Sequence, residues 1–345
     1  MKELQANNIQ KILVRATNWV GDAVMTTPAI HTIRKSFPSA EITLLAKSWV
    51  ASLFEASPDV DRIFIFDEKG RHAGAIGKWR LAKELQCEKF DAAILLQNAI
   101  EAALIAVFAK IPVRIGFNSD ARGFLLTHSV KRQPETFQKH QTEYYLDILR
   151  GIGLPVENTG LRLSVSETDI DAGKKLLEAE GVRLDKPIVG LNPSATFGPA
   201  KQWPIERYAD VAKRLIQNDH AKVIIFGGPS DIALGERLQN EIDEGVVLAG
   251  KTTLMQAAAV IGLCNVFITN DSGLMHVASA LQTPTVAIFG STNPVTTGPF
   301  SDRAAVVRTT LACSPCLKPE CPLGHLDCMM DIQADKIYAI AKEMM

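Results

Sequence analysis

The sequence predicts an α/β protein built from two doubly wound parallel sheets. Short runs of β-branched and apolar residues alternate with helical segments along the chain, a pattern typical of a parallel sheet covered by helices on both faces. The length of 345 residues suits two domains, each with a core of its own. The alternation is interrupted between Leu161 and Lys186, which we interpret as the linker between the two domains.

The first half of the chain contains four predicted strands and two predicted helices. The strands are expected at residues 11–15, 42–45, 62–66 and 92–96, and the helices at residues 27–37 and around Trp79, Leu81 and Leu85. Pro28 falls in the first turn of the earlier helix, where proline is tolerated. Gly21 and Asp22 are expected in the loop after the first strand.

The second half repeats this order after a charged helix that begins near Ser166 and ends near Gly181. Strands are expected at residues 188–191, 223–226, 246–248, 266–269 and 285–289, and helices from Pro204, from the cluster 270–273 and over 334–345. The predicted domains are therefore residues 1–165 and 186–333, with a C-terminal helix at 334–345.

Composition narrows the class of protein. Hydrophobic residues make up 47% and charged residues 22% of the chain, and no run reaches the roughly 18 apolar residues that a membrane span needs. The N-terminal stretch MKELQANNIQ is polar, so no secretory signal is expected and we predict a cytoplasmic protein with reduced cysteines. The net charge of −1 does not indicate nucleic-acid binding. Residues 1–150 hold 20 Lys and Arg against 16 Asp and Glu, a mild positive surplus that suits an anionic partner.

The most informative stretch runs from Asn270 to His276, between two predicted strands. The capping residues Asn270, Asp271, Ser272 and Gly273 open a helix there. A helix N-terminus leaves backbone N–H groups free and carries partial positive charge, so it favours a phosphate. In an open parallel sheet this turn lies at the carboxyl end of a strand, where ligands bind. The stretch therefore predicts a nucleotide or sugar-phosphate site.

Two further loops of the second half follow strands and carry ligand-like residues. The loop from Asn192 to Pro204 offers the hydroxyl of Thr196 and the positive charge of Lys201, both suited to a diphosphate. The loop from Gly227 to Asp231 ends in a carboxylate that could accept hydrogen bonds from ribose hydroxyls. The convergence of the three loops predicts that the second domain holds the nucleotide.

Several common motifs are absent. The first strand-to-helix turn, with Gly21 and Asp22, lacks the dinucleotide fingerprint G-x-G-x-x-G, and the sequence contains no Walker A motif and no G-x-S-x-G elbow. Two D-x-D patterns, at 59–61 and 169–171, are interpreted as turn and helix-start residues, so no metal is expected there. Asp22 fits either a helix cap or a general base, and the spacing alone leaves both open.

Four cysteines lie close together in the sequence: Cys313, Cys316, Cys321 and Cys328. A zinc site and a set of reduced, packed thiols are both compatible with them, and the irregular spacing favours packed thiols. Cys87 and Cys264 fall in apolar helical patterns and are predicted in the core.

Taken together, these motifs resemble the ADP-heptose:lipopolysaccharide heptosyltransferases, glycosyltransferase family 9. The resemblance rests on Arg15 with Gly21, Asp22 and Pro28, on the loop with Thr196, Lys201, Trp203 and Pro204, and above all on residues 270–276. The cysteine segment is similar to the type II members, which add the second heptose. The resemblance implies a GT-B fold, with two Rossmann-like domains facing across a cleft, and an inverting transferase that needs no metal or cofactor.

The resemblance also implies roles for individual residues. Asp22 matches the proposed base of the acceptor domain, and the ADP-heptose contacts match Thr196, Lys201, Asp231, Asp271, Gly273, Leu274 and His276. Phe197 departs from the pattern, since some relatives place a second hydroxyl residue there.

The acceptor is then the acidic inner-core lipopolysaccharide, reached by peripheral contact with the inner membrane. The positive residues of the first half are expected to bind it: Arg71, Lys78, Arg80, Arg114 and Arg122. Two other classes stay open, namely a GT-B enzyme or epimerase that uses another sugar nucleotide and a non-catalytic ADP-sugar-binding protein.

Overall fold

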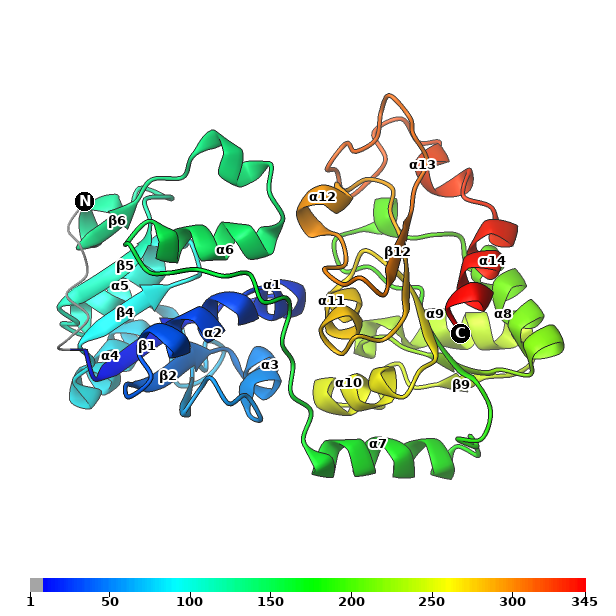
Figure 1. Cartoon of the computed structure of the whole chain (residues 1–345), viewed down its shortest axis with the longest axis horizontal. Helices are drawn as coiled ribbons and strands as arrows, with labels where there is room; N and C mark the ends of the chain where they lie inside the picture. The colour runs from blue at the N-terminus through cyan, green and yellow to red at the C-terminus, as the bar shows by residue number, and fades with distance from the viewer. Residues whose placement is uncertain (1–8) are drawn as a thin grey trace. The chain divides into compact units, whose positions relative to one another are not determined.

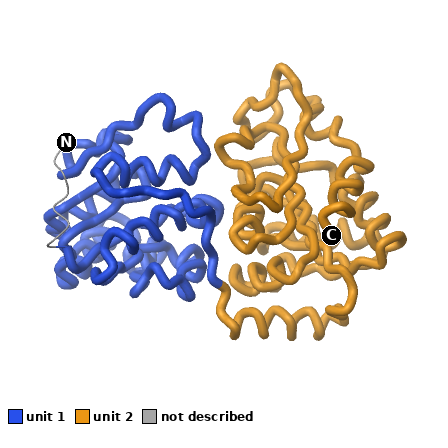
Figure 2. Tube along the Cα trace, in the orientation of Figure 1, with its two compact units in different colours: residues 1–164 blue, residues 165–345 orange. Residues whose placement is uncertain are grey.

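The computed structural model describes residues 9–345, which divide into unit 1, ending at Ser164, and unit 2, from Val165 to Met345 (Figure 2). The polar N-terminal stretch discussed above lies almost wholly outside the described residues. Within residues 9–345, no helix combines the length and the apolar character needed to cross a bilayer.

Unit 1 is built on a six-stranded parallel sheet with the strand order β3-β2-β1-β4-β5-β6 (Figure 1). The strands are β1 (Lys11–Arg15), β2 (Glu41–Ala46), β3 (Arg62–Ile65), β4 (Ala92–Leu95), β5 (Val113–Phe117) and β6 (His128–Val130). The central strands β1, β2 and β4 are buried almost throughout, as expected for a sheet covered on both faces. The connecting helices are α1 (Val20–Met25), α2 (Thr27–Ser36), α3 (Ser48–Ala51), α4 (Gly74–Glu88), α5 (Ile100–Phe108) and α6 (Gln141–Arg150).

Unit 2 repeats this architecture with the strand order β12-β11-β10-β7-β8-β9, again all parallel. Its strands are β7 (Ile188–Asn192), β8 (Lys222–Ile225), β9 (Val246–Val247), β10 (Val266–Asn270), β11 (Thr285–Ile288) and β12 (Ala304–Val307). Its helices are α7 (Glu167–Ala179), α8 (Ile205–Asp219), α9 (Ile232–Ile242), α10 (Leu254–Gly262), α11 (Gly273–Ala280), α12 (Pro294–Thr297), α13 (Asp327–Met330) and α14 (Ala334–Met344).

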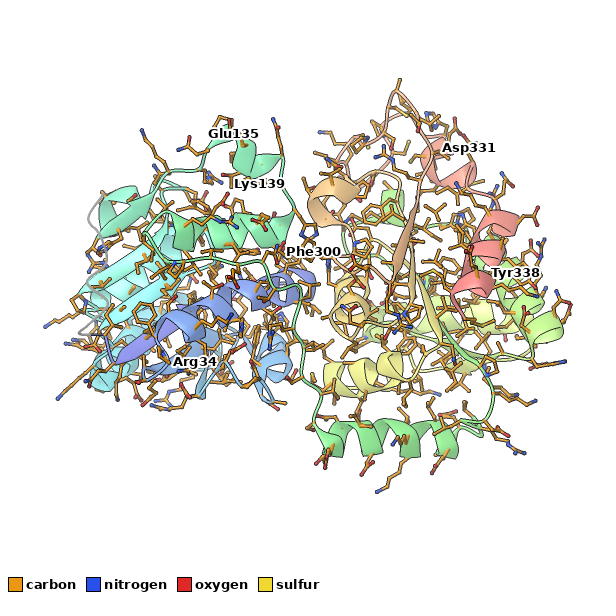
Figure 3. The ribbon with its side chains drawn as sticks, viewed as in Figure 1. Arg34, Glu135, Lys139, Phe300, Asp331 and Tyr338 are labelled. Carbon is orange, nitrogen blue, oxygen red and sulfur yellow. The ribbon has the colours of Figure 1, made fainter. Side chains whose placement is uncertain are left out.

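Local sequence signals explain several helix boundaries in unit 2. The hydroxyl of Ser166 caps α7 by accepting from the Asp169 amide at 3.1 Å, and Thr253 with Gln256 forms a capping box at α10. Helix α8 ends at His220, which adopts a left-handed conformation. The outer helix α14 is tied to α8 where Tyr338 (Figure 3) donates to Asp219 at 2.9 Å.

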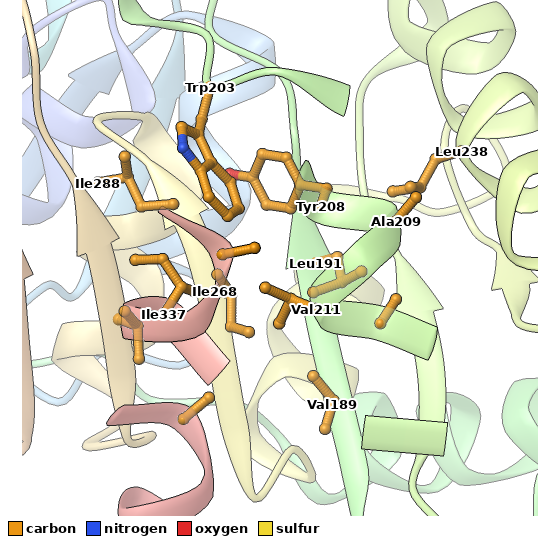
Figure 4. Packing of buried hydrophobic residues seen from close by; sticks show 14 of the residues in the cluster. Val189, Leu191, Trp203, Tyr208, Ala209, Val211, Leu238, Ile268, Ile288 and Ile337 are labelled. Carbon is orange, nitrogen blue, oxygen red and sulfur yellow. The ribbon is translucent and has the colours of Figure 1, made fainter. Parts of the chain in front are cut away.

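The core of unit 2 positions the carboxyl ends of β7 and β10. Figure 4 shows α8 residues packed against β7 and β10 residues, with Trp203 and Tyr208 at one end of this cluster. The two rings meet edge to face, with centroids 4.9 Å apart. Gly190 in β7 faces Phe267, and a Cβ on Gly190 would lie 2.5 Å from the Phe267 ring. Close packing therefore fixes β7 against β10.

Both sheets reverse their strand order beside their first strand. In unit 1 the chain winds from β1 outward to β3 and then crosses to β4, and in unit 2 it winds from β7 to β9 and then crosses to β10. Such a switch point leaves a crevice at the carboxyl ends of the two central strands, where ligands bind in open α/β sheets. Asp22 follows β1, and Asp271 follows β10.

The structure confirms the alternating α/β pattern but differs in three places. Gly21 and Asp22 lie inside helix α1 rather than in a loop, because the short run VGDAVM closes one helical turn after the extended residue Trp19. Cys87 is exposed on α4, whereas Cys264 is buried just before β10 rather than within a helix. Strands β5, β6 and β12 were not expected, since their short segments mix charged, polar and small residues with apolar ones.

Candidate functional site at the carboxyl edge of the second sheet

Two asparagines end the central strands of unit 2 and tie their loops together. Asn192, the last residue of β7, donates from Nδ2 to the Thr269 hydroxyl at 3.0 Å and to the Ser272 hydroxyl at 2.8 Å. Asn270, the last residue of β10, donates to the carbonyl of Pro193 at 2.8 Å. Both asparagines are buried, so these hydrogen bonds are made away from competing water.

Asn270 also holds the far end of the loop that follows β7. Its Oδ1 accepts from the backbone N–H of Trp203 at 3.1 Å and from the hydroxyl of Tyr208 at 3.1 Å. The loop 193–204 is therefore fixed at both ends to the same side chain. Lys201, which lies near the end of this loop, is thereby held close to Asp271.

Asp271 is the point where three segments of the chain meet. Its Oδ2 accepts from Lys201 Nζ at 2.6 Å and from the Thr292 hydroxyl at 2.6 Å. The Asp271 side chain is 6% exposed and that of Lys201 is 13% exposed. Phe197 stacks on the same ammonium group, whose nitrogen lies 4.7 Å from the ring centroid. A buried pair of this kind carries a large penalty if either partner is removed.

The N-terminus of α11 lies directly after this carboxylate. Ser272 caps the helix by accepting from the Met275 amide at 3.3 Å. Gly273 and Leu274 occupy the first helical positions, whose N–H groups have no acceptor within a helix. Both residues are partly exposed, whereas His276 is buried in the helix. The exposed part of the helix start therefore presents donors and partial positive charge beside Lys201.

The remaining predicted donor contacts lie on the two flanking loops. Thr196 is exposed on the loop after β7. Asp231 lies on the loop after β8, where its Oδ2 accepts from the Gly228 amide at 2.7 Å. The structure thus brings Lys201 and Asp271 into contact, whereas Thr196 lies exposed on its loop and the hydrogen bonds described for Asp231 stay within residues 228–231.

From the sequence, Asn270 was expected only as a capping residue, and Asn192 and Thr292 were given no individual role in the site. A usable signal was present, since each of the three is polar and lies at the carboxyl end of a strand or in the turn that follows. Such positions share one geometric feature, because the carboxyl ends of adjacent parallel strands meet at one edge of the sheet.

In unit 1, Asp22 lies in the first turn of α1, where a carboxylate also interacts favourably with the helix dipole. It is partly exposed. Burial, and secondarily the charge of Asp22, raise the pKa of the Tyr145 hydroxyl on α6 well above its usual range. Tyr145 therefore stays protonated near this carboxylate.

The predicted acceptor residues fall into two groups. Arg122 is fully buried and donates to the carbonyls of Phe117 and Gln97 and to Asn98 Oδ1. Its burial lowers the pKa of the guanidinium to about 10. Arg114 donates to the carbonyls of Leu125 and Ile111. These contacts give both guanidinium groups a role in holding the loops around β4 and β5.

Arg71, Lys78 and Arg80 instead lie on and just before α4. Arg71 pairs with Glu84 at 2.6 Å, Lys78 pairs with Glu101, and Arg80 donates to the carbonyl of Arg71 at 3.2 Å. Arg71 and Arg80 are exposed and Lys78 is partly exposed. These three side chains are accessible to a ligand, in contrast to Arg122.

The four late cysteines have no disulfide partner. Cys328 is buried at the start of α13, and the other three are partly exposed. Backbone N–H groups of residues 323–326 hydrogen-bond to the sulfur of Cys321 and lower the pKa of that thiol. Across residues 9–345, no three His, Cys, Asp or Glu side chains are grouped so as to hold a metal ion.

Comparisons with known proteins identify what this architecture is similar to. The family model of glycosyltransferase family 9 (heptosyltransferase) matches residues 78–327. The chain is 32% identical to lipopolysaccharide heptosyltransferase 2 of Salmonella typhimurium over 336 residues, which cover 95% of this chain and 96% of that protein.

Solved structures agree with the sequence comparison. The structure of E. coli ADP-heptose lps heptosyltransferase II matches with a TM-score of 0.82 and 29% identity, covering 97% of this chain and 98% of that one. A glycosyl transferase family 9 structure from Veillonella parvula matches with a TM-score of 0.87 and 25% identity, covering 99% and 98%.

We predict that the four late cysteines are reduced thiols with a structural role. In a thiol titration, protein purified without added metal is expected to contain four more reactive thiols than a variant in which all four cysteines are replaced by serine. Elemental analysis of the same protein is expected to find no stoichiometric metal. One equivalent of zinc per chain in that preparation would contradict this interpretation.

Proposed function

The chain belongs to glycosyltransferase family 9, the heptosyltransferases, and from that premise we propose that it moves L-glycero-D-manno-heptose from ADP-heptose to the first heptose of the lipopolysaccharide inner core. Its two parallel six-stranded sheets have the α/β organisation of a GT-B glycosyltransferase. The relatives that support the choice of donor and acceptor are named for heptosyl transfer to lipopolysaccharide.

The proposed reaction is a single displacement with inversion. An acceptor hydroxyl oxygen attacks the anomeric carbon of the heptose, the bond from that carbon to the diphosphate oxygen breaks, and the hydroxyl proton passes to a base. ADP leaves with the electron pair of the broken bond. Without a metal, the negative charge that develops on ADP has to be stabilised by protein dipoles and cations.

The main support for a donor site in unit 2 is that three loops meet at Asp271. Lys201 supplies a cation and the start of α11, at Gly273 and Leu274, supplies backbone N–H groups within the same edge of the sheet. We assign the diphosphate to Lys201, Thr196 and this helix start, the ribose to Asp231, and the heptose to Asp271 with His276 behind it. One of the three donors of the Lys201 ammonium is used on Asp271, and the others suit phosphate oxygens.

Asp22 is the proposed general base. It lies after β1, at the switch point of the unit 1 sheet, where an acceptor bound to that edge would meet it. The protonated Tyr145 hydroxyl nearby does not compete for the proton. The accessible cations Arg71, Lys78 and Arg80 are proposed to bind the acidic acceptor, whereas Arg114 and Arg122 hold the loops around β4 and β5.

The acceptor is a glycolipid, so we further propose peripheral contact with the cytoplasmic face of the inner membrane through α4. Ile76 and Trp79 are exposed by 77% and 57% on this helix. Lys83 lies one turn on, with its ammonium 5.3 Å from the Trp79 ring, and Arg80 is exposed beside it. An aromatic and aliphatic stripe flanked by cations complements an anionic bilayer.

The proposed function predicts strict donor selectivity. With a core lipid that ends in a single heptose, ADP-heptose is expected to give a product with one added heptose, and ADP is released in equal amount. UDP-sugars and GDP-sugars are expected to give no product. Transfer from a UDP-sugar, or binding of ADP-heptose with no turnover, would support the competing functions instead.

Lys201→Ala is expected to weaken ADP binding about 10- to 100-fold, because a charge-assisted hydrogen bond contributes about 1.5–3 kcal/mol. Calorimetric titration with ADP measures this directly. Lys213→Ala, which removes an exposed lysine of α8, is the matched control and should bind ADP like the unmodified chain. Equal ADP affinity in both variants would remove Lys201 from the site.

Asp22→Asn keeps the size of the side chain but removes the proton acceptor. We expect the heptose transfer rate to fall about 10²–10⁴-fold, with ADP-heptose affinity and thermal unfolding close to those of the unmodified chain. Loss of a helix-start interaction alone would cost about 1 kcal/mol of stability and little of the rate. Transfer at a near-normal rate would place the base elsewhere.

Replacing Ile76 and Trp79 together by alanine is expected to lower binding to vesicles that contain anionic phosphatidylglycerol by about tenfold or more, since each buried apolar side chain contributes about 1.5–3 kcal/mol. Co-sedimentation measures the bound fraction. Phe137→Ala is the control, because Phe137 is also exposed and contacts Arg132 but lies outside α4. Equal loss in both variants would exclude α4 as the membrane contact.

A further inference from the structure

The cysteine segment, residues 313–328, contacts both loops that meet at Asp271. On one side, the carbonyl of Pro319 accepts from the Ala200 amide at 3.0 Å. On the other side, the Leu317 amide donates to the carbonyl of Ser291 at 2.7 Å, and the Ser314 hydroxyl donates to the carbonyl of Gly290 at 2.8 Å. Each contact is one residue away from Lys201 or within two residues of Thr292.

Gly198 permits the first of these contacts. It has a φ of +148°, which L side chains rarely adopt, and a Cβ added to it would lie 2.4 Å from the carbonyl oxygen of Pro319. Any larger residue would therefore push the loop away from the segment. Because Lys201 follows Gly198 by three residues in the same turn, such a shift would move the ammonium group relative to Asp271.

The second contact is fixed by close packing. A Cβ on Gly290 would lie 2.4 Å from the sulfur of Met329 and 3.0 Å from the sulfur of Cys328. The turn that leads to Thr292 thus lies directly against the end of the cysteine segment. Inside the segment, the Gly324 amide donates to the Cys321 carbonyl at 3.2 Å and the Asp327 amide donates to Nδ1 of His325 at 3.0 Å, which holds the turn before α13.

We propose that the cysteine segment is a positioning element of the donor site. It contacts the two loops that place Lys201 and Thr292 on the Asp271 carboxylate, and we call this support the brace. The brace fixes the position of the Lys201 ammonium group, which binds the diphosphate. The segment itself supplies no group to the substrate. This inference rests on the proposed role of Lys201 in ADP binding. It assigns a functional role to the cysteine segment, which the proposed reaction does not otherwise use.

The test is a double-mutant cycle between Gly198 and Lys201. Gly198→Ala is expected to weaken ADP binding and raise the donor KM about 10- to 100-fold, since small displacements of a binding group have effects of this size. In the Lys201→Ala background the same substitution should add little, because the brace acts through the lysine. The KM for the acceptor should stay unchanged.

Gly181→Ala is the control for replacing a glycine of positive φ that has no neighbour to displace. Gly181 also has a positive φ, of +74°, but a Cβ there would meet nothing within 4 Å. A merely structural loss of stability would lower the thermal unfolding temperature of Gly198→Ala below that of Gly181→Ala and would add to the effect of Lys201→Ala. Ser314→Ala, which removes only one hydroxyl donor, provides a milder second variant with an expected smaller change of the same kind.

Three results decide the matter. Coupling between Gly198→Ala and Lys201→Ala, with unchanged thermal unfolding relative to Gly181→Ala, supports the brace. Full additivity of the two substitutions, or normal ADP affinity in Gly198→Ala, overturns it while leaving the donor site intact. If Lys201→Ala alone leaves ADP affinity unchanged, the assignment of the donor site fails first, and the brace to that site fails with it.

Discussion

The carboxylate of Asp271 is the constraint on which the second unit is organised. It is nearly inaccessible to water and accepts from Lys201 and Thr292, which come from two other loops. A buried charge without partners is expensive, so these loops have to be held where they can reach it. The hydrogen bonds of Asn192 and Asn270 to the neighbouring loop and helix start meet that requirement. The parallel sheet provides the frame, since the ends of β7 and β10 lie side by side.

The same arrangement provides positive charge for an anionic ligand from the side chains of the chain itself. The Lys201 cation is kept in place by Asp271 and Phe197 before any ligand binds. Preorganised charges need little rearrangement when negative charge develops on a leaving group. The cation and the helix start beside it are placed by the fold itself, and the cysteine segment adds hydrogen bonds to the loops that carry Lys201 and Thr292.

The sequence was sufficient to predict the alternating α/β architecture and the positions of the polar loops that follow β7, β8 and β10. Both predictions rest on local signals, namely short buried runs such as residues 266–270 and the polar clusters that follow them. The contact of Lys201 with Asp271 spans 70 residues, and no local pattern reveals such a pairing. The roles of Arg114 and Arg122 were hidden for a related reason. The sequence alone does not distinguish a buried arginine that donates to backbone carbonyls from an arginine that binds a ligand.

Asp22 illustrates a further limit. The sequence predicts a turn around Gly21, whereas six residues close into helix α1 because the chain enters from the extended residue Trp19. Short helices depend on tertiary packing more than on propensity, and here α1 packs against α2, α3 and α6. The position of the carboxylate was therefore predictable along the chain, at the end of β1, but its place in a helical turn was not.

We propose above that the Asp271 site of unit 2 binds the diphosphate of the donor. A crystal structure of the chain with a non-hydrolysed ADP-heptose analogue tests it most directly. We expect diphosphate oxygens within hydrogen-bond distance of Lys201 Nζ and of the N–H groups of Gly273 or Leu274, with the heptose beside Asp271. A diphosphate bound away from Lys201 and from the start of α11 would contradict it.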